Sequence, residues 1–219
     1  KIEQQKSNAV KNKELCRWMI QNYMGVEEIL GDFYGWLKDH RDDKNYRLKT
    51  DYTPKRQEER ELLRRVGMDG ESIDKTFLKG EIRFLTGDWL SDFCFNEISM
   101  LPVDDCVVGI ELISPKGADN EFDVMFTKDN ALYIVECKSL KQRHDKDADI
   151  LYKISALQHD FGLRVNGFLV STARSIISDS KDIRENIIRR AKQCKTEVIH
   201  PDEIENLGRF IKNQVKGLS

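Results

Sequence analysis

The sequence predicts an α/β protein: a mixed central sheet flanked by helices, preceded by a helical N-terminal segment. Two observations support this fold class. From residue 107 onward, short apolar runs rich in β-branched and aromatic residues are typical of strands, and helical periodicity precedes and separates them. The 219 residues suit one domain of ordinary size with a modest appendage.

The N-terminal third has the period of helices. Residues 15–37 are predicted to be helical, with a break at Gly25, and their apolar positions follow one stripe: Val26, Ile29, Leu30, Phe33 and Leu37. Residues 38–53 are poor in aliphatic side chains and predict an exposed connection, followed by a charged helix at 55–66. A further helix is expected from Asp74 to about Phe95. We place the N-terminal segment or linker at 1–70 and the main domain at 71–219.

The main domain alternates strands with helices in its second half. Strands are predicted at 107–113, 121–127, 132–138, 167–171 and 197–199. Helices are predicted at 181–195, at 202–215 and around the stripe Ile150, Ile154, Leu157 and Phe161. An antiparallel first half and helix-linked later strands follow from this order.

Composition excludes several classes of protein. No segment has the length and apolarity of a membrane span, and no secretory signal begins the chain, so a cytoplasmic location is expected. The five cysteines and four histidines are scattered without metal-ligand spacing, which argues against a zinc site or a disulfide framework. The chain begins at Lys1, and we expect it to be a fragment of a larger protein.

Two carboxylates are predicted to meet in a β-hairpin. Asp129-Asn130 separates two apolar runs and is acceptable chemistry for a two-residue loop. With that loop, the cross-strand register puts Asp123 directly opposite Glu136. Cβ atoms of such neighbours are about 4.5–5.5 Å apart, where like charges are destabilising without a cation. The pair therefore predicts a Mg²⁺ or Mn²⁺ site.

Lys138 is predicted to join the same site, because strand alternation returns it to the face of Glu136. An ammonium there would orient an attacking water and balance charge on a phosphate, which favours metal-assisted phosphodiester hydrolysis. The alternative is a partly exposed ion pair of little value.

The rest of the hairpin is apolar on both faces, so we expect helices to cover both. One face carries Met125, Thr127, Leu132 and Ile134, and the other carries Phe122, Val124, Phe126, Tyr133, Val135 and Cys137.

The sequence also resembles a known nuclease family. Asp123, followed thirteen residues later by Glu136-x-Lys138, is similar to the PD-(D/E)xK core of restriction-endonuclease-like nucleases. Further motifs resemble the nuclease half of the CRISPR-associated Rossmann-fold (CARF) effector nucleases of type III CRISPR systems. These motifs are Trp89-Leu90 and segments 120–124, 134–138, 151–153 and 167–171, and the resemblance extends from about Phe77 to the C-terminus.

The resemblance implies roles for individual residues. Asp123 and Glu136 would be metal ligands, with the Cys137 carbonyl as a third, and Lys138 would be the catalytic lysine. Lys153 would be a supporting catalytic or phosphate-binding residue, the alternative being a solvated helix lysine.

The family usually has an acid directly after Trp-Leu, where this chain has Ser91. The candidates to replace that acid are Glu81, Asp88 and Asp92, which share one helical stripe; the alternative is that this stripe faces solvent.

Basic residues near the predicted site favour contact with a nucleic acid backbone. The loop after strand 132–138 must pass beside the site, and it carries Lys141, Arg143 and Lys146; Arg174 follows strand 167–171. The basic helix at 181–195 could also track phosphates, although a solvated outer face is the more common role of such helices.

The sequence thus predicts a metal-dependent endonuclease acting on DNA, RNA or both. By resemblance, the full-length protein would be a homodimeric antiviral CRISPR ancillary effector that binds cyclic oligoadenylate through an N-terminal CARF sensor missing from this chain. The alternatives are a restriction- or repair-type nuclease on the same core, and a catalytically weak nucleic-acid-binding module.

Overall fold

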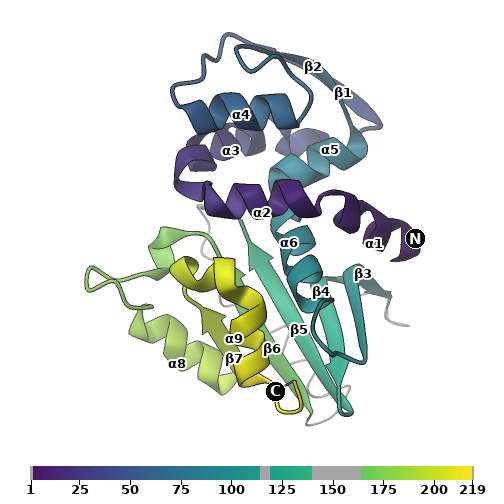
Figure 1. The fold of residues 1–219 in the computed structure, drawn as a ribbon, viewed down its shortest axis with the longest axis vertical. Coiled ribbons are helices and arrows are strands. Elements are labelled where there is room, and N and C mark those ends of the chain that lie inside the picture. The colour runs from purple at the N-terminus through teal and green to yellow at the C-terminus, as the bar shows by residue number, and fades with distance from the viewer. Residues whose placement is uncertain (1, 114–118, 140–163, 219) are drawn as a thin grey trace. The chain divides into compact units, whose positions relative to one another are not determined.

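The computed structural model describes residues 2–113, 119–139 and 164–218 (Figure 1). The chain divides into two compact units by packing. We call Glu14–Trp89 the helical unit, and Lys1–Lys13 together with Leu90–Ser219 the sheet unit. The domain division predicted at residue 70 stays a prediction. Among the residues described, no helix is long and apolar enough to cross a membrane.

The helical unit combines helices with a two-stranded sheet. Its elements are α2 (Lys13–Gln21), α3 (Tyr23–Leu37), the 3₁₀ turn η1 (Lys38–His40), β1 (Asn45–Thr50), α4 (Gln57–Arg65), β2 (Ile73–Leu78), α5 (Lys79–Arg83) and the π-helical turn η2 (Phe84–Asp88). The predicted apolar stripe of α3 is confirmed, because all five of its residues are fully buried. The charged helix predicted at 55–66 is α4.

The predicted break at Gly25 is wrong, since the helices separate at Asn22 and Gly25 lies inside α3. Glu58 of α4 approaches Gly25 so closely that a Cβ atom there would lie 2.6 Å from its Cγ atom. The glycine therefore allows two helices to pack rather than ending one.

Residues 45–50 and 73–78 are the main correction to the predicted secondary structure. The first segment was expected to be an exposed connection and the second to begin a helix, but they pair as antiparallel strands, with Asn45 opposite Leu78 and Thr50 opposite Ile73. Neither segment contains a continuous apolar run or a regular alternation of apolar and polar residues, so the local pattern carries no strand signal. The pairing across more than twenty residues supplies the hydrogen bonds that neither segment has alone.

The sheet unit contains the remaining elements. They are α1 (Ile2–Lys11), α6 (Trp89–Ile98), β3 (Asp105–Ile113), β4 (Asp119–Lys128), β5 (Ala131–Lys138), β6 (Val165–Ser171), η3 (Arg174–Ile176), α8 (Glu185–Gln193), β7 (Thr196–Ile199), η4 (Pro201–Asn206) and α9 (Leu207–Gln214). All five predicted strands are confirmed. The last predicted helix is the pair η4 and α9, and the basic helix α8 is shorter than predicted.

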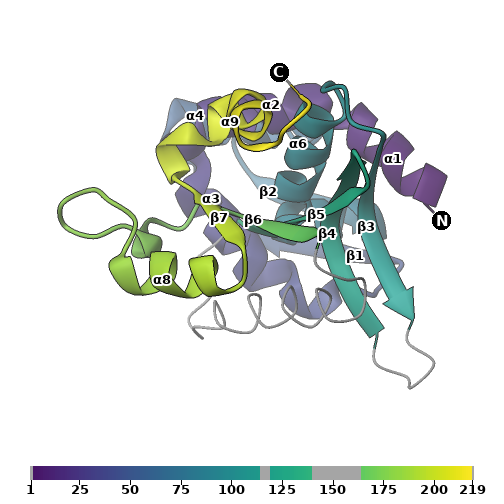
Figure 2. The ribbon, with the colours of Figure 1, turned by 90° about the horizontal axis from the view of Figure 1, so that it is seen from below.

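The five strands form one mixed sheet in the order β3-β4-β5-β6-β7. Strands β3, β4 and β5 are antiparallel, and β5, β6 and β7 are parallel. Figure 2 shows α6 and α9 on one face of this sheet and α8 on the other. Helices on both faces agree with the apolar composition of both faces of the hairpin. The predicted stripe from Ile150 to Phe161 lies outside the described residues.

Candidate active site

The hairpin that carries the predicted acids forms as expected. Asp129 and Asn130 make the two-residue loop, and both have positive φ angles, 49° and 58°. Aspartate and asparagine tolerate this left-handed backbone, which matches the twist of the flanking strands. Lys128 then pairs with Ala131. The loop therefore sets the register that brings the two acids to the same end of the sheet.

Regular pairing of β4 with β5 runs as far as Val124 opposite Val135, and the next residues are Asp123 and Glu136. Here a side chain replaces the backbone ladder, because Asp123 Oδ2 accepts a 2.7 Å hydrogen bond from the Cys137 N–H. A carboxylate that accepts a backbone N–H is held in a fixed orientation. Asp123 is thus fixed against the end of β5.

Strand β4 is irregular at the same point. Phe122 packs in the apolar cluster of Met125 and Ile134, although simple alternation predicted it on the opposite face. On the neighbouring strand β3, Gly109 has a φ angle of 62°, and its carbonyl accepts a 2.8 Å hydrogen bond from Gln5 Nε2 of α1. This local departure from regular pairing breaks the alternation, so the prediction for Phe122 is wrong.

Glu136 and Lys138 lie together at the end of β5. Lys138 Nζ is 3.4 Å from Glu136 Oε1, and the exposed fractions of the two side chains are 27% and 8%. The structure thus contains the ion pair named as the alternative, with Lys138 partly exposed and Glu136 buried, and the catalytic role of Lys138 stays a prediction. A carboxylate buried to this degree needs a partner of opposite charge, and Lys138 supplies one.

The side chain of Cys137 faces α6. Its Sγ atom lies 3.5 Å from the Sγ atom of Cys94, which is fully buried on that helix. Burial raises the pKa of the Cys137 thiol well above its ordinary value, and the Cys94 thiol and the charges of Asp123 and Glu136 raise this pKa further. The thiol is therefore neutral, and the backbone carbonyl is the group of Cys137 suited to a hard cation.

The last residue of β6 and the residue after it hold the end of β5. Lys138 pairs with Ser171, the last residue of β6. The Thr172 N–H then donates to the Lys138 carbonyl at 3.0 Å, and Thr172 Oγ1 donates to the Ser139 carbonyl at 2.8 Å. Sequence reasoning missed Thr172. The available signal was its position directly after a strand parallel to the one that carries Glu136.

Ser91 and Asp92 belong to the sheet unit, as do the hairpin acids. Ser91 is buried on α6, with 7% of its surface exposed. Asp92 Oδ2 accepts a 2.7 Å hydrogen bond from Asn12 Nδ2, which connects α6 to the end of α1. Asp92 therefore holds α6 to the end of α1.

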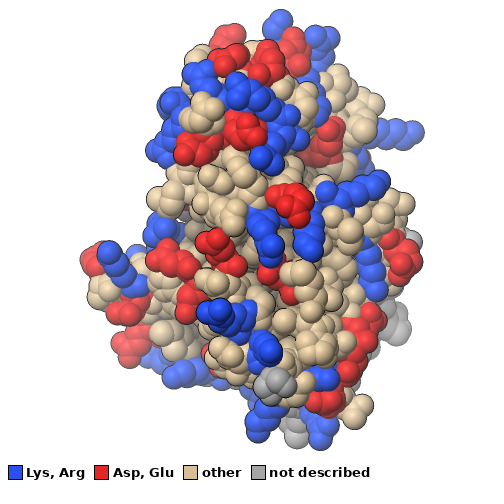
Figure 3. All heavy atoms as spheres, viewed as in Figure 1, with Lys and Arg blue, Asp and Glu red and all other residues tan. Residues whose placement is uncertain are grey.

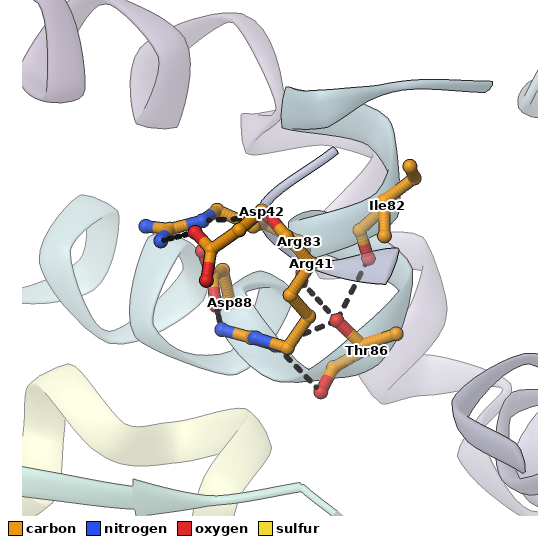
Figure 4. Close-up of polar contacts among 6 residues, drawn as sticks. All are labelled: Arg41, Asp42, Ile82, Arg83, Thr86 and Asp88. Carbon is orange, nitrogen blue, oxygen red and sulfur yellow. Dashed lines mark hydrogen bonds and ion pairs between the residues drawn. The ribbon is translucent and has the colours of Figure 1, made fainter. Parts of the chain in front are cut away.

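The other two candidate acids, Asp88 and Glu81, belong to the helical unit, and each has a basic partner there. Arg41 donates to Asp88 Oδ1 at 2.8 Å and to the Thr86 carbonyl at 3.1 Å, which fixes the π-helical turn around Gly87 (Figure 4). Glu81 Oε1 lies 2.7 Å from Lys75 Nζ.

Glu81 also accepts the Leu78 N–H at 2.8 Å, at the start of α5. Through these contacts Asp88 and Glu81 stabilise turns and helix ends of the helical unit.

The predicted nucleic-acid contacts are only partly within the described chain. Arg174 follows β6 as predicted, and its Nη2 atom lies 3.3 Å from Asp202 Oδ1. Lys141, Arg143, Lys146 and Lys153 lie outside the described residues. On the face drawn in Figure 3, basic and acidic side chains are interspersed. A nucleic acid interface therefore stays a prediction.

The donors at the end of β5 fit a divalent cation of the Mg²⁺ or Mn²⁺ type. Asp123 and Glu136 offer carboxylate oxygens and Cys137 offers a carbonyl, and all three are hard ligands. Within the described ranges, no group of three or more His, Cys, Asp or Glu side chains is arranged to hold a metal. A cation here would take its remaining ligands from water and substrate phosphate, as Mg²⁺ usually does.

Comparison with known proteins identifies the class of this protein. The profile of the Card1-like endonuclease domain matches residues 78–217, and the chain belongs to this family. The matched residues include Asp123, Glu136 and Lys138. No curated protein sequence matches the chain significantly.

Two solved structures share its fold. Protein VC1899 from Vibrio cholerae superposes with a TM-score of 0.75 at 21% sequence identity, over 95% of this chain and 56% of that one. Can2 from Sulfobacillus thermosulfidooxidans, solved in complex with cyclic tetra-adenylate, superposes with a TM-score of 0.60 at 17% identity, over 89% of this chain and 54% of that one. The chain thus spans just over half the length of each. The predicted restriction-endonuclease-like fold is confirmed.

Proposed function

We propose that this chain is a metal-dependent nuclease that hydrolyses phosphodiester bonds of DNA, RNA or both. One observation carries the proposal: in a member of an endonuclease family, the hairpin brings Asp123 and Glu136 to one sheet end, with Lys138 Nζ 3.4 Å from Glu136 Oε1. Two acids can hold a divalent metal, and a lysine beside them can orient water and balance charge on a phosphate, which together support metal-assisted phosphodiester hydrolysis.

Each residue has a role in this proposal. Asp123, Glu136 and the Cys137 carbonyl would hold Mg²⁺ or Mn²⁺, which supplies Lewis-acid polarisation of the phosphate when bound. Lys138 Nζ donates hydrogen bonds to a phosphate oxygen and balances the negative charge that builds up during attack by water. The backbone bond from Cys137 keeps Asp123 oriented before substrate arrives, so little reorganisation is needed.

We further propose that the whole protein is an antiviral CRISPR ancillary effector, active as a homodimer in the cytoplasm. The support is family membership together with the shared fold of Can2, which was solved with cyclic tetra-adenylate. In this proposal a sensor domain outside these 219 residues binds cyclic oligoadenylate, and residues 1–70 connect it to the nuclease domain.

A cleavage assay tests the nuclease proposal. Labelled single- and double-stranded DNA and RNA are incubated with the chain in Mn²⁺, in Mg²⁺ and in a chelator, and the products are resolved by length. We expect cleavage of at least one substrate with a divalent cation and none with the chelator. The double variant Asp123→Asn/Glu136→Gln, purified in parallel, controls for contaminating nucleases. Equal cleavage by this variant, or no divalent-dependent cleavage of any substrate, would contradict the proposal.

A further inference from the structure

We propose that Thr172 is a positioning residue for Lys138, acting through the backbone at the end of β5; this inference rests on the proposed function. The structure gives Thr172 two bonds to consecutive carbonyls of the chain that leaves the site. Its N–H binds the Lys138 carbonyl at 3.0 Å and its hydroxyl binds the Ser139 carbonyl at 2.8 Å.

The need for such an anchor follows from the position of Lys138. It is the last residue of β5, and its pairing with Ser171 is the last of the parallel ladder between β5 and β6. The Thr172 N–H binds the carbonyl of this last pair, and the Thr172 hydroxyl extends the contact between the two chains by one residue, to the Ser139 carbonyl. A lysine has a long, flexible stem, so the place of its ammonium depends on a fixed Cα position and backbone direction.

Burial makes the anchor effective. Thr172 is 3% exposed and Ser139 is 7% exposed, so water competes little for the hydrogen bond between them. Removing the hydroxyl would delete this buried bond, and the backbone of Ser139 would shift away from the end of β6. The shift would begin one residue from Lys138 and reach the Lys138–Glu136 contact.

The hydroxyl of Thr172 can be removed by substitution while its backbone N–H stays. Valine has nearly the shape of threonine and keeps the backbone N–H. Thr172→Val therefore removes the hydroxyl bond to the Ser139 carbonyl and the longer 3.5 Å hydroxyl contact with the Lys138 carbonyl, and it leaves the N–H bond to the Lys138 carbonyl. Thr172→Ser keeps both bonds. If Thr172→Val does not fold, Thr172→Ser compared with Thr172→Ala isolates the same oxygen atom.

Thr196 offers a matched control on the edge strand β7. It is also 3% exposed, and its hydroxyl donates to the Cys194 carbonyl at 3.1 Å. Thr196→Val therefore deletes a part-buried hydroxyl-to-carbonyl bond of an equally buried threonine in the same sheet, on a strand that carries none of the proposed catalytic groups.

The first measurement is kinetic. With the oligonucleotide that the wild-type chain cleaves fastest in Mn²⁺, we expect Thr172→Val to lower kcat about tenfold with KM changed less than about twofold, because a small misplacement of a catalytic group costs rate more than binding. Thr172→Ser should restore kcat, and Thr196→Val should leave it unchanged. Wild-type kcat in Thr172→Val, or an equal loss in Thr196→Val, would overturn the inference.

The second measurement does not depend on nuclease activity. Acetic anhydride labels accessible lysine amines, and peptide mass spectrometry gives the labelling rate at Lys138. We expect Thr172→Val to raise this rate at least about threefold and Thr172→Ser to restore it, because the ammonium leaves its contact with Glu136. An unchanged rate would refute positioning by Thr172, whereas full cleavage by Lys138→Ala would refute the proposed function instead.

Discussion

In the helical unit, Asp88 is bound by Arg41, whereas at the end of the five-stranded sheet Glu136 contacts Lys138 and Asp123 accepts the Cys137 N–H. Asp88 and Arg41 are 42% and 33% exposed, so their pair is partly solvated and its value lies in fixing a turn. Glu136 is 8% exposed, and Asp123 is oriented by a backbone N–H.

This contrast explains why two groups of acids serve different purposes. A partly exposed acid facing an arginine is neutralised and gains stability for its own segment. At the sheet end Glu136 is buried and Asp123 is half-buried, and the one contact with Lys138 offsets only part of the repulsion between two like charges. Such a group becomes favourable when a cation binds it. Variants of both regions test whether the acids of the helical unit serve stability and the acids of the sheet end serve metal binding.

The largest effect is expected from neutralising the hairpin acids. Glu136→Gln and Asp123→Asn should each lower divalent-dependent cleavage by about a thousandfold or more, because each removes a charged ligand. Melting temperature in metal-free buffer should be unchanged or slightly higher, since one of two like charges is gone. Glu197→Gln, an exposed acid of β7, is the control and should cleave normally. Loss of several kcal/mol of stability would mean that the acids are structural.

Lys138→Ala should separate cleavage from binding. We expect kcat to fall about a hundredfold, because the ammonium beside Glu136 is lost from the reacting phosphate. Affinity for a labelled oligonucleotide, measured by fluorescence anisotropy, should change less than about threefold, since one lysine supplies a small part of phosphate attraction. The matched control is Lys212→Ala on α9. Near wild-type turnover at saturating substrate would show that Lys138 is a structural partner of Glu136.

A smaller effect is expected at Ser91, where the family pattern has an acid. Ser91→Glu should lower the Mn²⁺ concentration for half-maximal cleavage by about fivefold, because it restores a carboxylate ligand. Titration of Mn²⁺ against cleavage measures this shift. Asp92→Asn is the comparison: collapse of its activity, with no gain from Ser91→Glu, would identify Asp92 as the acid that already fills the role.

The smallest effect on cleavage is expected in the helical unit. Arg41→Ala removes three hydrogen bonds, two to Thr86 and one to Asp88 (Figure 4), and should lower stability by roughly 1–2 kcal/mol. Cleavage and its metal dependence should stay unchanged in Arg41→Ala and in Asp88→Asn. If Asp88→Asn needs a higher metal concentration for half-maximal cleavage, at unchanged stability, Asp88 belongs to the metal site. The proposed difference between the two regions would then be wrong.

Much of the sheet unit could be predicted because its signals are local. The five strands follow from apolar runs, and the hairpin register follows from the two residues Asp129-Asn130, whose positive φ angles confirm the loop. That register alone brings Asp123 and Glu136 to one end of the sheet. The roles of these acids and of Lys138 stay predictions.

The helical unit was predicted less well, because its corrections depend on partners distant in the sequence. Strands β1 and β2 have weak patterns of their own and exist through each other. Glycine often ends a helix, so the sequence predicts a break at Gly25. In the structure the close approach of Glu58 leaves no room for a side chain there, and this contact explains the glycine. The spacing of residues within one segment does not identify the distant strand or helix that packs against it.

The sequence by itself determined the five strands of the sheet unit and the hairpin loop whose register brings the two acids to one end of the sheet, since period and turn chemistry act over a few residues. The tertiary structure decided how that site is held: the Cys137 N–H on Asp123, the changed face of Phe122 and the bonds of Thr172. These contacts join strands whose approach is set by the folding of the whole sheet. No local pattern encodes such an approach, because burial and geometry arise only when distant segments pack together.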